Sequence, residues 1–122
     1  MKRVEEFTLA GKNFCDLDLT GLNTVGEFTE FGEAFKAAAA KYPESSLYIV
    51  ANFENIRFDS ESKRILSDSV AYCAPYIKWG AAFGIDGITK MMMLTICKTI
   101  GWNNMHFAFT KAKAIEWLLQ QE

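Results

Sequence analysis

The chain has 122 residues, enough for one domain and too few for two independent hydrophobic cores. Half of the residues are apolar and 14% are aromatic, which excludes a disordered chain. The formal net charge of −2 at pH 7 gives no global field that would attract nucleic acid or an anionic membrane. We therefore expect one domain over residues 1–122 and no nucleic-acid partner.

The charge is divided unevenly along the chain. Residues 1–61 carry six basic and eleven acidic side chains, whereas residues 62–122 carry seven and four. This asymmetry can orient a partner protein or pair two copies of the chain, although ordinary sequence scatter also produces it.

Cysteine usage and the N-terminal residues bear on the compartment. Cys15, Cys73 and Cys97 lie far apart in the sequence and form no metal-ligand or redox pair, so we expect buried free thiols in a reducing cytoplasm. The first residues are charged and lack the apolar run of a signal peptide. No stretch approaches the roughly 20 apolar residues that span a bilayer, so we expect a cytoplasmic protein with no integral membrane segment.

The pattern of apolar and turn residues predicts strands alternating with helices. The first helix begins with a T-x-x-E capping box at Thr24 and Glu27, and the third ends at Gly101. In chain order we expect strands at 4–10 and 13–19 joined by a tight turn, a helix from 24 to about 42, a strand at 47–51, a helix from 59 to about 74, a strand at 79–85, a helix at 88–100, a strand at 105–109 and a last helix capped by Thr110.

The order β-β-α-β-α-β-α-β-α predicts an α/β fold. Strands linked through helices form right-handed βαβ crossovers and a largely parallel sheet. The opening hairpin adds an antiparallel edge. We therefore expect a four-to-five-stranded, mostly parallel mixed sheet flanked by helices.

Two stretches resemble the SpoIIAA-like superfamily. Residues 47–60, LYIVANFENIRFDS, are similar to the STAS pattern of an apolar strand, a short turn and a segment that opens a helix. Residues 78–87, KWGAAFGIDG, together with Phe109, Thr110, Ala112, Ala114, Ile115, Trp117 and Leu118, resemble the STAS/SEC14-type subgroup of small bacterial proteins. The resemblance implies a SpoIIAA-like sheet in a cytoplasmic bacterial protein, and it leaves activity open because relatives bind proteins, nucleotides or lipids.

Ser60 is the nearest counterpart of the serine that a kinase phosphorylates in switched STAS regulators. The chain has Asp59-Ser60-Glu61-Ser62 where those regulators have Asp-Ser-Ser-Gly. A phosphate on Ser60 would lie at a helix N-terminus, which favours negative charge. Asp59 and Ser60 are also ordinary helix-capping residues, so capping is the alternative interpretation.

The loops that follow the two interior strands are candidate ligand or partner contacts. Gly84 and Gly87 flank a strand-to-helix junction with Lys90 in the first helical turn, a pattern that can cradle an anion. Asp86 opposes an anion, and Asp-Gly is a routine turn. Ligands gather at strand C-termini in open α/β sheets, so we group the following residues as a candidate loop site: Asp59, Ser60, Gly84, Asp86, Gly87 and Lys90.

The third helix is apolar on most of its circumference. Such a helix needs a second cover, which is a partner, a second copy of the chain or a lipid-like ligand, unless all of its apolar residues fill the core. The candidate interface residues are Met91, Met92, Ile96 and Trp102.

Catalytic and metal-binding patterns are weak in this sequence. His106 is the only histidine and lies in a predicted strand, and no Asp/Glu/His cluster has metal-ligand spacing. We expect no metal and no cofactor.

A small enzyme that uses His106 is the weakest hypothesis. The leading hypothesis is a non-enzymatic regulatory or protein-interaction module that binds a partner protein or a second copy of itself as a homodimer. The alternative is a carrier or sensor of a small apolar or lipid-like ligand.

Overall fold

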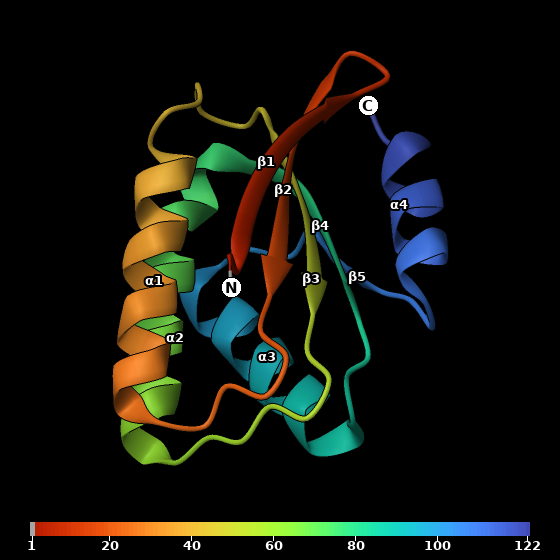
Figure 1. Cartoon of the computed structure of the whole chain (residues 1–122). Coiled ribbons are helices and arrows are strands. Elements are labelled where there is room, and N and C mark those ends of the chain that lie inside the picture. Colours follow the sequence, from red (N-terminus) through yellow and green to blue (C-terminus); the bar gives the residue numbers. More distant parts are fainter. Residues whose placement is uncertain (1) are drawn as a thin grey trace.

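The structure is a computed structural model that describes residues 2–122. It consists of a five-stranded mixed sheet with helices on both faces (Figure 1). The fold class and the element order predicted from the sequence are confirmed. In chain order the elements are β1 (Val4–Leu9), β2 (Lys12–Asp18), α1 (Val25–Ala39), β3 (Leu47–Asn52), α2 (Ser60–Cys73), a short 3₁₀ turn (Ala74–Tyr76), β4 (Ile77–Phe83), α3 (Gly87–Ile100), β5 (Met105–Phe107) and α4 (Lys111–Leu119).

The strands lie side by side in the order in which they occur along the chain. β1 and β2 pair antiparallel, and β2 to β5 are parallel to one another. Ala10 and Gly11 form the hairpin turn, one residue earlier than predicted, with φ values of 51° and 75°. Positive φ at both positions matches the right-handed twist of the two strands and fixes their register.

The strand order decides where the helices lie. Each of the three crossovers from β2 to β5 moves to the next strand in the same direction. Right-handed crossovers of this kind bring α1, α2 and α3 to the same face of the sheet. α4 follows the last strand and packs on the opposite face, against β3 and β4 (Figure 1). The helix layer therefore has α1 at one end and α3 at the other.

Two apolar cores result, one on each face of the sheet. β3 is buried on both faces, as its continuous apolar run predicts. Cys15 and Leu17 on β2, and Leu19 directly after this strand, face the three helices. The alternation of residues along β2 predicts that Phe14 shares a mainly polar face with Asp16 and Asp18. Phe14 is instead completely buried, because that face is covered by α4 and Phe7 stacks on Phe14 at 5.1 Å between ring centroids.

Several element boundaries and burial assignments differ from the expectation. β4 begins two residues earlier, at Ile77, and ends before Gly84, whose φ of +65° leaves the strand conformation. The spacing of apolar residues predicts Ile65 on the inward side of α2, but Leu66 is the residue that is fully buried there and Ile65 is only partly buried. The sequence pattern predicts Leu119 on the buried face of α4, but Leu119 is 36% exposed because it lies at the end of a helix of only nine residues. Within residues 2–122, no helix is both long and apolar enough to cross a membrane.

Candidate functional site

The outward face of α3 carries three large apolar side chains that the fold leaves in solvent. Asp86, predicted from the sequence to lie in a turn, caps the helix, and Gly101 ends it in the left-handed conformation as the sequence predicts. Ile88, Met91 and Leu94 are 76%, 71% and 49% exposed. Their spacing of three residues sets them along one side of the helix, and we call them the α3 ridge.

Two of the predicted interface residues lie in the core instead. Met92 and Ile96 are 5% and 3% exposed and pack between α3 and the sheet. Their burial shows that the prediction of Met92 and Ile96 as exposed interface residues was wrong. The reason is the helical period: residues one position apart differ by about 100° around the axis, so Met92 turns inward where Met91 turns outward. Of the predicted set, Met91 lies on the surface and Trp102 is half-buried.

A surface groove of about 500 Å³ adjoins the ridge at the C-terminal half of α3. Leu94 belongs to both the ridge and the groove, and Cys97, Lys98, Trp102 and Met105 form the rest of its apolar and cationic walls. Burial raises the pKa of the Cys97 thiol, so this wall is neutral.

Trp102 fits closely onto β4. A Cβ atom built on Gly80 would lie 3.1 Å from Cη2 of Trp102, so the glycine permits the indole ring to approach the strand. The indole Nε1 is buried and has no hydrogen-bond partner within residues 2–122. The groove therefore has a rigidly packed aromatic wall.

The charges beside the ridge are positive. α3 contains Lys90 and Lys98 and no acidic residue. The Lys90 ammonium lies 4.9 Å from the centroid of the Phe107 ring on β5, a cation–π distance. Among the ion pairs of residues 2–122, none involves Lys90 or Lys98. Both charges are thus available to a ligand or partner.

The loops after β3 and β4 meet in a polar hollow of about 380 Å³. Gly84 and Asp86 line it together with residues 54–57. Gly84 has a φ of +65°, and a Cβ atom there would lie 2.4 Å from Cγ of Glu54, so only glycine fits. The backbone N–H of Thr89 donates to the Asp86 carboxylate at 2.7 Å and holds the pKa of that carboxyl below its usual value.

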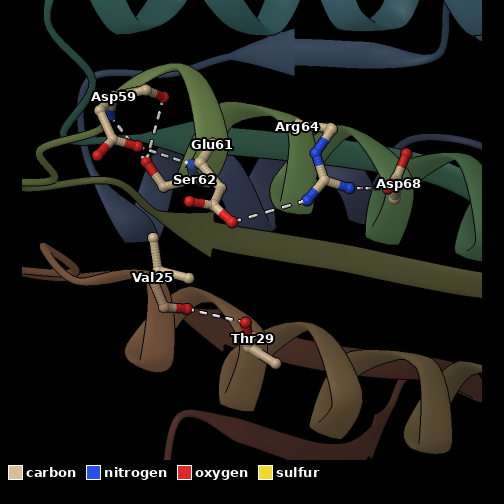
Figure 2. A network of polar contacts seen from close by, with 7 residues as sticks. All are labelled: Val25, Thr29, Asp59, Glu61, Ser62, Arg64 and Asp68. Carbon is tan, nitrogen blue, oxygen red and sulfur yellow. Dashed lines mark hydrogen bonds and ion pairs between the residues drawn. The ribbon is translucent and has the colours of Figure 1, made fainter.

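Asp59 and Ser60 do not line this hollow. They begin α2 beside the start of α1, whereas α3 begins beneath β4 (Figure 1). Figure 2 shows the reciprocal cap in which the Ser62 N–H donates to Asp59 at 2.8 Å and the Asp59 N–H donates to the Ser62 hydroxyl. Hydrogen bonding lowers the pKa of Asp59. Ser60 is exposed, and nearby Arg64 is engaged by Glu61 and Asp68.

The predicted loop site is therefore divided. Gly84 and Asp86 meet at the hollow, Gly87 forms the first turn of α3, and Lys90 is directed to β5. The sequence pattern indicated that these residues lie near strand ends, but it could not determine which loops come together in space.

The interior space beside α3 is small. It amounts to about 30 Å³ between the sheet and the helices, and Trp102 and Met105 separate it from the surface groove. That volume holds about one water molecule. Ligand pockets measure roughly 300–1,000 Å³, so a lipid-like ligand would require α3 or Trp102 to move.

His106 takes part in an aromatic cluster on the other face of the sheet. Its ring stacks on Trp117 with centroids 4.2 Å apart and planes 5° apart, and Trp79 meets Trp117 edge-on. The imidazole thus packs β5 against α4.

Comparison with known proteins gives no family assignment: no protein-family model matches the chain, and no curated protein matches it significantly. Ile88 and Leu94 are the two ridge residues that the sequence-based candidate set omits. The signal was present, because Ile88, Met91 and Leu94 repeat at intervals of three.

Proposed function

We propose that this chain is a non-enzymatic protein-interaction module of the STAS-like kind, which binds a partner protein through the α3 ridge and the adjoining groove. The observation that carries this proposal is the exposure of Ile88, Met91 and Leu94 on one side of one helix. Monomeric proteins seldom expose contiguous apolar surface of this kind except at interaction sites.

The opposite end of the helix layer provides an internal comparison. α1 and α3 each have a helical neighbour on one side only, so both present an outer flank. The outer residues of α1 include Glu27, Glu30 and Glu33, and its large apolar side chains are buried. Equivalent positions in the layer thus carry opposite surface chemistry, and the apolar flank of α3 is not a requirement of the fold.

A protein partner is favoured over a small apolar ligand by the shape of the site. The interior space beside α3 is about 30 Å³, whereas the groove of about 500 Å³ is open to the surface. An open groove continuous with a helical ridge presents an elongated surface, which suits another polypeptide.

Site-specific photo-crosslinking tests this proposal. A benzophenone amino acid replaces Met91 in one variant and Tyr72 on α2 in a control, because both side chains are helical and at least half exposed. After irradiation in the host cell, the variant at position 91 is expected to give a defined protein adduct. Mass spectrometry identifies the adduct, and the identified protein is then purified and its binding reconstituted.

The control decides whether the adduct is specific. Equal yields of protein adduct from positions 91 and 72, or no protein adduct from position 91, would contradict the proposal. In a reconstituted complex, Met91→Glu is expected to weaken binding at least tenfold, because a charge would be buried in an apolar contact.

A further inference from the structure

We infer that the segment received by the α3 ridge and its groove is an acidic amphipathic helix of another protein. This inference rests on the proposed function and adds the chemistry of the partner. Two properties of the surface carry it: its elongated helical shape and the charge of α3, which contains two lysines and no acidic residue.

The shape of the surface fits a helix. The three ridge residues span about 9 Å along α3, and the groove extends the apolar surface to Trp102. A helix that lies alongside α3 can insert apolar residues at intervals of three and four into this surface. Addition of a strand is the other common mode, but the neighbouring edge strand β5 has only three residues.

The charge of the surface selects an acidic partner. Lys98 forms part of the groove wall and Lys90 lies at the β5 side of the helix, and neither is in an ion pair within residues 2–122. The nearest acid along the chain, Asp86, is engaged as the helix cap. Glutamates or aspartates that border the apolar stripe of a docking helix would pair with both lysines.

A second copy of the chain is a poorer occupant of this surface. Two α3 helices in contact would bring four lysines into one interface. The acidic helix α1 cannot serve either, since its apolar stripe of Phe28, Phe31 and Phe35 is buried in its own core. The surface therefore fits a helix from a different protein better than any helix of this one.

Two synthetic peptides test the inference. Both are helical, lack tryptophan and carry the same leucine stripe at intervals of three and four, but one has glutamates beside the stripe and the other has lysines. Binding to the full chain is followed by intrinsic tryptophan fluorescence, in which Trp102→Phe identifies the signal from the groove. The glutamate peptide is expected to bind at least tenfold more tightly, and this preference should shrink at 1 M salt, where the Debye length is about 3 Å.

Three variants locate the binding and its charge preference. Met91→Glu should weaken binding of the glutamate peptide at least tenfold, Lys98→Glu should reduce or reverse the preference for glutamate, and Tyr72→Glu on α2 should change neither. All three positions are exposed, and circular dichroism verifies the fold of each variant. Failure of both peptides to bind, equal binding of the two, or insensitivity to Met91→Glu overturns the inference.

The crosslinking result separates this inference from the proposed function. If position 91 reacts with a second copy of this chain, or with a non-acidic segment of a partner, the acidic-helix inference fails and the interaction module stands. If position 91 gives no specific protein adduct, the proposed function fails as well.

Discussion

Adjacent methionines of α3 should differ sharply in their contribution to stability. Met92 is 5% exposed and Met91 is 71% exposed. Replacing methionine with alanine removes the three heavy atoms beyond Cβ. At Met92 this costs about 2.4 kcal/mol of transfer free energy and leaves a cavity, so we expect a loss of about 3 kcal/mol. At Met91 most of the side chain is already in water, and the loss should stay below about 1 kcal/mol.

Urea unfolding followed by circular dichroism measures both changes in the free energy of unfolding. Met92→Ala should lower the unfolding midpoint without changing the slope of free energy against urea, and should lower Tm by about 10 °C. Met91→Ala should lie close to the wild type. Similar losses for the two variants, or a larger loss for Met91→Ala, would mean that α3 does not present the face described here and would remove the basis for the α3 ridge.

Three further measurements address the loops and the thiols. Gly84→Ala should cost about 3 kcal/mol in urea unfolding because of positive φ and steric overlap, whereas Gly87→Ala, which meets no atom within 4 Å, should be neutral or stabilising. The pKa of Asp86 is lowered in the folded protein, so its ionised form stabilises the fold at pH values above the ordinary pKa near 3.8, and this contribution is lost as the pH falls through the pKa of the folded state. Asp86→Asn keeps a capping side chain but cannot titrate, so its Tm should fall less than that of the wild type between pH 5 and pH 2. Burial raises the pKa of Cys15 and Cys73 to about 12, so neither thiol should react with a disulfide reagent at pH 8 until urea unfolds the chain; rapid reaction of the native protein would contradict their burial.

Local signals in the sequence were sufficient for the fold class. The Thr24–Glu27 capping box and the Gly101 helix end both form as predicted, because their hydrogen bonds join residues only a few positions apart. The alternation of strands and helices then leaves few arrangements, since crossover handedness and short connections restrict the topology.

The candidate site was harder to predict because it depends on which face each residue turns to. Met91 and Met92 are identical in type and adjacent in sequence, and only the packing of α3 on the sheet separates surface from core. The burial of Phe14 likewise depends on α4, a helix about a hundred residues further along the chain. The loops of Ser60 and Gly84 both follow parallel strands, yet residues 54–57 occupy the space next to Gly84 and α2 begins elsewhere.

The strand order itself accounts for the exposed position of the α3 ridge. Three crossovers in one direction build a helix layer with two ends, and each end helix has a flank without a helical neighbour. At the α1 end, acidic residues make that flank compatible with water. At the α3 end, the short strand β5 adds little cover, and Ile88, Met91 and Leu94 stay exposed. A polar residue at any of these positions should leave the fold intact, so their apolar character is not needed for folding, which supports the proposed partner contact.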